Sequence, residues 1–309
     1  MIIPIVFAFD NNLAWPASVC IFSLLQHAKE NTIYDIFILH HKDENLNLTY
    51  INQVLNRFPK HSLQLRSVDD TFNQSFEIRG ITTPAYYRLL IPKIIPEYDK
   101  AIYSDVDVIF RQDLSDLYTS TNMENFYVAA VNNLAHLFPD LKKHYGLTLM
   151  LDTKQIICSG FLIINSKKIL HDNIIPQFLK LAKKKFKFQD QDIINITCKN
   201  AICQLPPQYS VLTYINETIV YDKRSLLNLW EDSEISEAMS NGNIHYNGQK
   251  PWKGWCINFD IWWEYYRKSP VFDEKTYFDF FHNHLNELDQ LSLWKRIKIL
   301  IRFFVYGRK

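Results

Sequence analysis

Two carboxylates in the sequence have the spacing that would let them bind one cation together. Asp105 and Asp107 end or interrupt an apolar, strand-forming segment, AIYSDVDVIF at 101–110. Alternate side chains of an extended backbone point to the same side, so both carboxylates would face one way. An imidazole from His245, at the end of another apolar segment, would complete a ligand set suited to Mn²⁺ or Mg²⁺. The spacing alone fits solvated residues at the end of a strand equally well.

A metal site of this kind would replace a glycine-rich phosphate loop. The chain has seven glycines, and none of them forms a GxGxxG or GxxxxGK[ST] motif. Phosphate oxygens could instead complete the octahedron around the metal. The side-chain cations Arg88 and Lys250 could bind the phosphate oxygens in place of the backbone amides of such a loop.

Two further polar segments could contribute to a site. QDQD at 189–192 precedes an apolar-periodic segment, where acidic side chains favour a helix N-terminus and cap its free amides. We prefer this structural role for Asp192. HYNGQKPW at 245–252 brings a His, a Gly, a Lys and a Trp together, and a structural turn would not explain the His and the Lys together.

The elements that would position these residues alternate between strands and helices. Apolar segments at 2–9 and 35–41 are separated by a segment of helical spacing at 14–28. Continuous apolar strands indicate a largely parallel sheet covered on both faces. Ligands bind such sheets beyond the carboxyl ends of the strands, where Asp10 and Asp105 are expected. Further strands are expected near 63–68, 126–131, 160–166 and 243–246, and helices near 44–57, 84–91 and 167–187 and from 189.

We predict one α/β domain at residues 1–265, followed by a helical appendage at 266–309. No internal repeat or Pro/Ser-rich linker breaks the first part, and no segment reaches 18 apolar residues. The N-terminal apolar run lacks a basic region before it and ends at Asp10, unlike a secretory signal. Five cysteines without a CxxC pair argue against a disulfide framework or a zinc knuckle. A cytoplasmic chain with reduced thiols is therefore expected.

The last nineteen residues, 291–309, differ from the rest in charge. They hold six basic residues and no acidic one, whereas residues 1–290 hold 28 basic and 33 acidic residues, a net charge of −5. The overall charge of +1 gives no support to a nucleic-acid partner. On a helix, Lys295, Lys298 and Arg302 would form one stripe, and Trp294, Ile297, Ile301 and Phe304 another. This pattern is typical of a helix lying at a membrane interface, and the alternative is a terminal helix that docks on the domain.

Five sequence blocks together resemble the family 8 glycosyltransferases. These are retaining enzymes with the GT-A fold, a Rossmann-like α/β fold, and they include bacterial lipopolysaccharide galactosyl- and glucosyltransferases and the glycogenins. The resemblance covers about residues 1–265. In order along the chain, the blocks are TTPAYYRL at 82–89, YSDVDV at 103–108, SGFLIIN at 159–165, QDQD at 189–192 and HYNGQKPW at 245–252.

The resemblance implies a role for each matching residue. Asp105, Asp107 and His245 would bind Mn²⁺, or Mg²⁺, which would bridge the diphosphate of a UDP-sugar. Lys250 and Gly248 would contact the diphosphate, and Asp10, Asn12 and Val106 would contact the rest of the nucleotide. Arg88 and Asp190 would contact the donor sugar, and Gln191 would lie beneath its anomeric carbon.

The implied reaction moves galactose or glucose from a UDP-hexose to a saccharide or lipooligosaccharide acceptor. Retention could involve a covalent intermediate on Asp190 or a same-face displacement, which we prefer. Bacterial relatives with basic, aromatic tails act on lipid-linked acceptors. The resemblance thus implies a peripheral enzyme on the cytoplasmic face of the inner membrane, with its tail on the anionic leaflet.

Two departures from the family pattern leave alternatives open. Leu13 stands where the family often has a stacking residue, and Cys158 where an Asn is common. A catalytically silent UDP-sugar-binding protein would tolerate both. The segment IYSDVDV at 102–108 also fits the nucleophile motif of haloacid-dehalogenase-type phosphatases, with Asp105 phosphorylated. That motif normally lies on the first strand of the chain, and it would leave the HYNGQKPW block unexplained.

Overall fold

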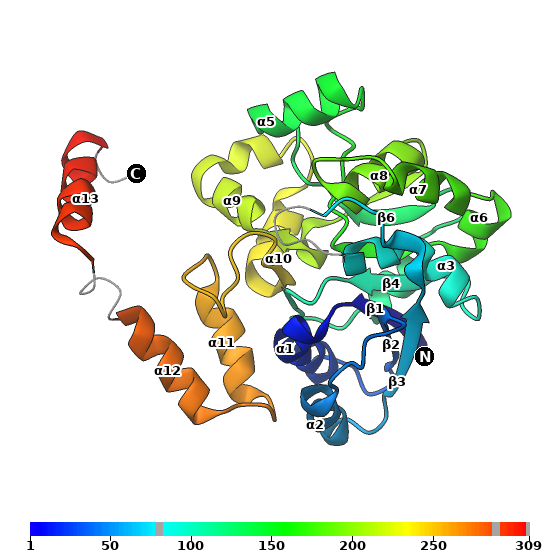
Figure 1. Cartoon of the computed structure of the whole chain (residues 1–309). Coiled ribbons are helices and arrows are strands. Elements are labelled where there is room, and N and C mark those ends of the chain that lie inside the picture. The colour runs from blue at the N-terminus through cyan, green and yellow to red at the C-terminus, as the bar shows by residue number, and fades with distance from the viewer. Residues whose placement is uncertain (78–82, 286–290, 307–309) are drawn as a thin grey trace. The chain divides into compact units, whose positions relative to one another are not determined.

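The structure is a computed structural model that describes residues 1–77, 83–285 and 291–306 (Figure 1). The chain divides into two units, Met1–Val271 and Phe272–Lys309. The boundary expected at residue 265 falls inside helix α11 (Phe259–Lys268), and the first unit ends just after that helix.

A seven-stranded sheet with the order β3-β2-β1-β4-β7-β6-β8 forms the centre of the first unit. β7 is antiparallel to both of its neighbours, and the other pairs are parallel. The expected mostly parallel, mixed sheet is therefore confirmed. The strands are β1 (Ile2–Ala8), β2 (Ile33–His41), β3 (Ser62–Val68), β4 (Ala101–Ser104), β6 (Val128–Val131), β7 (Phe161–Ile164) and β8 (Ile202–Leu205).

A second sheet of three short strands brings His245 to the Asp105–Asp107 pair. It has the order β5-β10-β9, with β5 (Val108–Ile109), β10 (Ile244–His245) and β9 (Val211–Leu212). The single strand expected at 101–110 is wrong, because the chain leaves the large sheet after β4 and enters the small one at β5. In the small sheet His245 pairs with Val108, next to Asp107.

Helices cover the large sheet on both faces (Figure 1). The single helix expected at 167–187 is wrong, because Asn173 has a positive φ of 54° and separates α6 (Ser166–His171) from α7 (Ile175–Ala182), which has a proline in its first turn. The helix expected at 84–91 is a 3₁₀ helix, Thr83–Leu90, that continues into α3 (Ile91–Ile94). The other α-helices of the first unit are α1 (Ala14–Gln26), α2 (Thr49–Arg57), α4 (Ser115–Ser120), α5 (Pro139–Lys142), α8 (Gln189–Cys198), α9 (Thr213–Leu226) and α10 (Asp232–Asn241).

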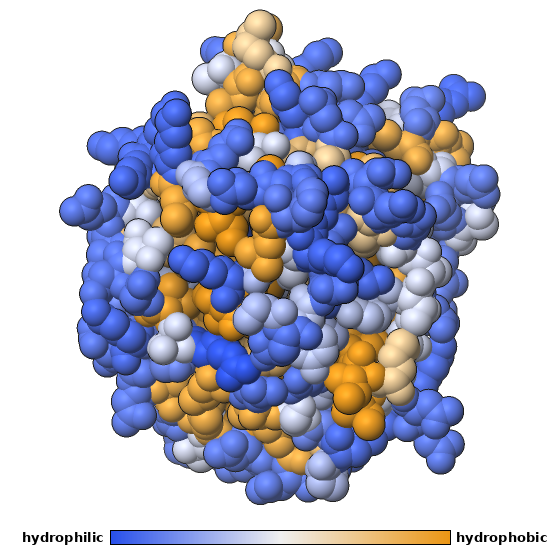
Figure 2. All heavy atoms as spheres, turned by 90° about the vertical axis from the view of Figure 1, so that its right-hand side faces the viewer, coloured by the Kyte–Doolittle hydropathy of each residue, from blue (hydrophilic) through white to orange (hydrophobic). Residues whose placement is uncertain are grey.

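The core of the first unit lies on the strands of the sheet and the helices over it. Ile5, Val6 and Phe7 of β1 are fully buried, as expected for a central strand covered on both faces. Trp15 of α1 packs edge-on against Trp262 of α11, with 5.4 Å between the ring centroids. The aromatic residues of α11 are thus core residues. Figure 2 shows one face of the molecule, on which several apolar areas lie between hydrophilic side chains.

The described residues of the second unit form the helices α12 (Glu274–Leu285) and α13 (Leu293–Tyr306). α13 contains the expected basic and apolar stripes, and Trp294 and Phe304 are exposed. Two of the six basic residues of the tail, Arg308 and Lys309, lie outside the described residues. Among the described helices, none combines the length and the hydropathy needed to cross a membrane.

Candidate functional site

A cavity of about 500 Å³ lies beyond the carboxyl ends of β1 and β4. This is the position at which ligands bind open α/β sheets. Its lining brings together residues from all five sequence blocks, although Thr82 of the first block lies outside the described residues. The predicted site residues that line it are Asp10, Arg88, Asp105, Val106, Asp107, Asp190, Gln191, His245, Gly248 and Lys250.

Asn12 is the predicted site residue that does not line the cavity. It is exposed, and its backbone N–H donates to Asp10 Oδ1 at 2.9 Å, which caps the short 3₁₀ helix Asn11–Leu13. Leu13 and Cys158, the two departures from the family pattern, both line the cavity.

The three predicted metal ligands form one cluster. Their ligand atoms all lie within 4.8 Å of one another. His245 Nε2 lies 3.2 Å from Asp107 Oδ1 and 3.7 Å from Asp105 Oδ2. On the other side of the ring, Nδ1 lies 3.3 Å from Ser210 Oγ, which orients the imidazole with Nε2 toward the carboxylates.

The cluster fits a divalent cation on two observations. Asp107 Oδ1 is buried, and within the described residues it lies 3.2 Å from His245 Nε2 without the geometry of a hydrogen bond, although a buried carboxylate oxygen normally accepts one. Gly160 makes room at the cluster, because a Cβ there would lie 2.2 Å from His245 Cε1 and 2.6 Å from Asp105 Oδ2. Two carboxylates and an imidazole are donors that Mn²⁺ and Mg²⁺ accept.

Basic side chains keep Asp107 ionised. Lys250 Nζ pairs with Asp107 and donates to the carbonyl oxygen of Tyr246 at 2.6 Å. Burial would raise the pKa of Asp107, but Lys250 and His245 outweigh it and hold that pKa well below its usual range. Burial would lower the pKa of His245, but the Asp107 carboxylate outweighs it and raises that pKa to about 10. A cation would therefore displace a proton from His245.

Arg88 connects the metal cluster to the start of α8. It is buried and is therefore not a surface residue. Its Nη2 donates to Asp105 Oδ1 at 2.8 Å, its Nη1 to the carbonyl oxygen of Ser159 at 2.6 Å, and its Nε lies 3.2 Å from Asp190 Oδ2. The guanidinium also lies over the Tyr103 ring at 4.2 Å. One cation thus holds two cavity carboxylates in fixed positions.

Asp190 and Gln191 enter the cavity from the first turn of α8. Ser159 Oγ donates to Asp190 Oδ2 at 2.7 Å, and Ser159 N donates to Gln191 Oε1 at 3.3 Å. Burial raises the pKa of Asp190, although Arg88 acts in the opposite direction. Asp192 does not line the cavity. Its Oδ2 accepts from the backbone N–H of Phe188 at 3.0 Å, so the predicted capping role is confirmed.

Several cavity residues were not predicted as site residues. Ser159 bonds to three of the predicted residues, and its only signal in the sequence was the SGFLIIN block. Tyr214 comes from α9, which follows β8 and β9, and none of these elements was predicted. Asn133 and Phe188 also line the cavity and carried no sequence signal.

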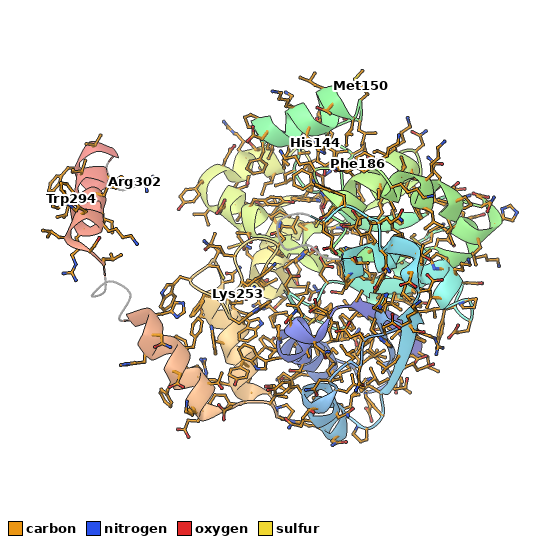
Figure 3. The ribbon with its side chains drawn as sticks, in the orientation of Figure 1. His144, Met150, Phe186, Lys253, Trp294 and Arg302 are labelled. Carbon is orange, nitrogen blue, oxygen red and sulfur yellow. The ribbon has the colours of Figure 1, made fainter. Side chains whose placement is uncertain are left out.

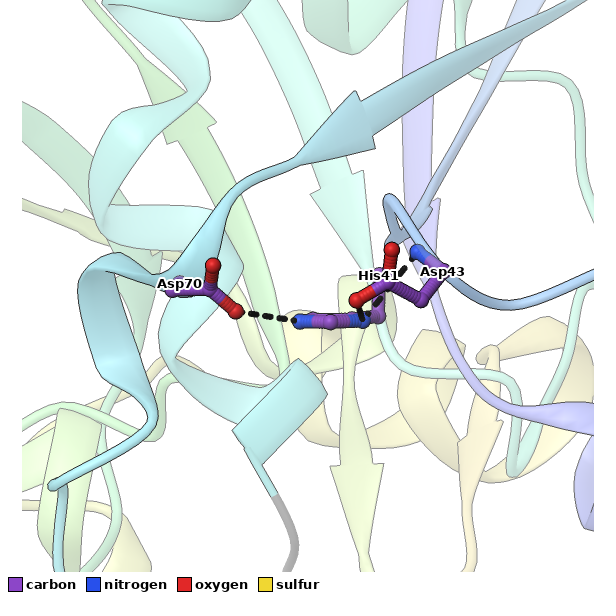
Figure 4. A group of neighbouring side chains, drawn as sticks. All are labelled: His41, Asp43 and Asp70. Carbon is purple, nitrogen blue, oxygen red and sulfur yellow. Dashed lines mark hydrogen bonds and ion pairs between the residues drawn. The ribbon is translucent and has the colours of Figure 1, made fainter.

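A second group of residues of the kinds that bind metals lies at the end of β2 and beyond β3. His41, Asp43 and Asp70 have ligand atoms within 4.8 Å of one another. Figure 4 shows that the two ring nitrogens of His41 face different carboxylates, with Nε2 3.2 Å from Asp70 and Nδ1 3.7 Å from Asp43. Lys42 also pairs with Asp70. These contacts form an ion-pair network near the surface, outside the cavity.

Comparison with known proteins gives a family model described as "Glycosyl transferase family 8", which matches residues 4–256. A putative glycosyltransferase of Haemophilus influenzae is 30% identical over 64% of this chain and 60% of its own length. A lipopolysaccharide 1,2-glucosyltransferase of Escherichia coli is 24% identical over 84% of this chain and 77% of its own length. The chain thus spans about three fifths of the length of the Haemophilus relative.

Solved structures show the same fold. The galactosyltransferase LgtC, in complex with donor and acceptor sugar analogues, has a TM-score of 0.71 at 22% identity and covers 88% of this chain and 98% of its own. The bifunctional glycosyltransferase WbbM has a TM-score of 0.72 at 22% identity and covers 92% of this chain and 52% of its own. The expected GT-A fold is therefore confirmed.

Proposed function

Because the chain belongs to glycosyl transferase family 8, we propose that it is a Mn²⁺-dependent, retaining hexosyltransferase. It would move galactose or glucose from a UDP-sugar to a saccharide or lipooligosaccharide acceptor. The observation that carries the proposal is that one cavity contains both the Asp105–Asp107–His245 cluster and the Arg88–Asp190–Gln191 network.

The metal cluster and its surroundings would bind the nucleotide diphosphate. Asp105, Asp107 and His245 would hold Mn²⁺, or Mg²⁺, and Lys250 with Gly248 would contact the diphosphate. When bound, the cation would stabilise the negative charge that develops on the departing diphosphate. Asp10, Asn12 and Val106 are proposed to hold the nucleoside, although Asn12 would have to reach it from outside the cavity lining.

Arg88, Asp190 and Gln191 would position the donor sugar. Asp190 Oδ2 already interacts with Ser159 Oγ and Arg88 Nε, so this carboxylate is held in place. A carboxylate held by two donors is a good acceptor for a sugar hydroxyl and a weakened nucleophile. This supports a same-face displacement over a covalent intermediate on Asp190.

The two other candidate functions have less support. In a phosphatase Asp105 would be the nucleophile, but its Oδ1 accepts from both Arg88 Nη2 and Tyr103 Oη at 2.8 Å. Hydrolysis of an aryl phosphate that is lost in Asp105→Asn would favour that function. A catalytically silent protein would bind UDP, but it would release no UDP from any UDP-sugar donor.

The first prediction concerns binding of UDP. We expect UDP at about 100 times its Kd to stabilise the protein by about 3 kcal/mol when Mn²⁺ is present, which is a rise in Tm of several degrees. UDP alone should give no comparable shift. Thermal unfolding with UDP, Mn²⁺ or both tests this, and a screen of UDP-Gal, UDP-Glc and UDP-GlcNAc for UDP release identifies the donor. Equal shifts with and without Mn²⁺ would contradict metal-dependent binding.

We also propose that α13 attaches the enzyme to the cytoplasmic face of an anionic membrane, where a glycolipid acceptor would be found. Trp294 and Arg302 belong to this helix (Figure 3). The apolar side chains Trp294, Ile301 and Phe304 are all more than half exposed, and Lys295, Lys298 and Arg302 are exposed as well. A helix with exposed basic and aromatic residues fits a lipid headgroup layer.

The second prediction tests this attachment. Reversal of three charges in α13, Lys295→Glu, Lys298→Glu and Arg302→Glu, should weaken binding to phosphatidylglycerol-containing vesicles at least about 100-fold, since each basic residue near such a surface contributes about 1 kcal/mol. Co-sedimentation with vesicles measures this. The matched control, Lys180→Glu, Lys183→Glu and Lys184→Glu, changes the net charge equally. An equal loss in both variants would show that general charge, and not α13, causes binding.

A further inference from the structure

A buried tyrosine lies behind Gln191 and contacts its side-chain amide. Gln191 Nε2 donates to Tyr145 Oη at 2.7 Å, and Gln191 Oε1 accepts from the backbone N–H of Ser159 at 3.3 Å. A backbone N–H can only donate, so the oxygen of the amide must face Ser159 and the nitrogen must face Tyr145. The two contacts together determine the orientation of the amide.

Tyr145 is itself rigidly held. It is fully buried in a small apolar cluster with Ala135, Leu151 and Ile156, and its ring is stacked on Phe188 at 6.0 Å with an interplanar angle of 13°. It belongs to a π-helical turn, Lys143–Thr148, a rare conformation that is frequent at functional sites. His144 of the same turn is labelled in Figure 3.

The hydroxyl proton of Tyr145 also has a defined environment. Because the phenol oxygen accepts from Gln191, its own proton must point elsewhere. Burial, and then the nearby charge of Asp192, raise the pKa of Tyr145, so the phenol stays protonated. Asp192 is fully buried, and its Oδ1 has no hydrogen-bond partner within the described residues. Its Oδ2 accepts from His144 Nε2 at 2.8 Å, if that nitrogen carries the proton, and from Phe188 N.

We propose that Tyr145 is a positioning residue that fixes the side-chain amide of Gln191 in the cavity. The inference rests on the proposed glycosyl transfer. Positive charge develops at the anomeric carbon in such a reaction, so a fixed amide dipole is more effective than one that rotates. Tyr145 does not line the cavity and would act only through Gln191.

The test compares Tyr145→Phe with Tyr34→Phe. Tyr34 is also fully buried, accepts from the backbone N–H of Leu114 at 2.9 Å and does not line the cavity, so it is a matched control. The first readout is the side-chain amide ¹⁵N–¹H resonance pair of Gln191, identified by its loss in Gln191→Ala. We expect Tyr145→Phe to shift this pair and Tyr34→Phe to leave it unchanged.

The second readout is UDP release from the sugar donor. Loss of one hydrogen bond to the amide should lower kcat roughly tenfold in Tyr145→Phe. The KM for the donor and the stabilisation by UDP with Mn²⁺ should stay at wild-type values, because the metal cluster is untouched. In the Gln191→Ala background, Tyr145→Phe should cause no further loss, since residues that act through one another are not additive.

Two results would overturn the inference. One is an unchanged Gln191 resonance pair in Tyr145→Phe, and the other is an equal loss of kcat with and without Gln191. If the wild-type protein releases UDP from none of the donors, the proposed function fails, and the resonance pair alone then decides whether Tyr145 positions Gln191.

Discussion

Asp107→Asn is expected to abolish the Mn²⁺-dependent stabilisation by UDP and to lower the rate of UDP release at least about 100-fold, because metal stabilisation of a leaving group contributes several kcal/mol. The substitution preserves the shape of the side chain and removes its charge. It would also remove the carboxylate with which Lys250 pairs, while the bond from Lys250 to the Tyr246 carbonyl oxygen would stay. We therefore expect a loss of about 1–3 kcal/mol in the free energy of unfolding as well.

Asp43→Asn is the matched control for this experiment. It makes the same change in the exposed His41–Asp43–Asp70 group, which contains the same ligand types outside the cavity (Figure 4). Its rate of UDP release and its stabilisation by UDP with Mn²⁺ should equal those of the wild type. Wild-type values in Asp107→Asn, measured by thermal unfolding and a UDP-release assay, would remove Asp107 from the metal site.

The positions of the site residues could be predicted because they follow strands. Asp10 comes two residues after β1 and Asp105 directly after β4, and parallel strands bring their carboxyl ends to one edge of the sheet. The distance between Asp107 and His245 could not be predicted in this way. It depends on two-residue strands, β5 and β10, whose pairing is too short to leave a periodic pattern in the sequence.

Residues that act behind the cavity left even less trace in the sequence. Tyr145 lies in a π-helical turn, and such a turn has no sequence period of its own. Asp192 was correctly predicted to cap the start of α8, but its contact with His144, 48 residues earlier, depends on tertiary packing. Local patterns thus predict which residues begin or end an element, whereas partners distant in sequence require the fold.

Gly160→Ala is the second substitution with a large expected effect. The glycine lies between β7 and the metal cluster, and its carbonyl oxygen accepts from Asp105 N at 2.8 Å. A Cβ at this position would lie 2.2 Å from His245 Cε1 and 2.6 Å from Asp105 Oδ2, which is closer than real Cβ contacts. The imidazole and the carboxylate must both move, so binding of Mn²⁺ and UDP release should fall at least about 100-fold.

Gly248→Ala is the control for this steric effect, because it also replaces a glycine of the cavity with alanine. Among the residues that the structure describes, a Cβ at Gly248 would meet only Thr213 Oγ1, at 3.9 Å, which is ordinary contact. This second variant should bind Mn²⁺ as the wild type does, even if its contact with the diphosphate changes. Calorimetric titration of both variants with Mn²⁺ distinguishes the cases. Unchanged Mn²⁺ affinity in Gly160→Ala would show that the cation is not held between Asp105 and His245, because those two ligands cannot keep their positions beside an added methyl group.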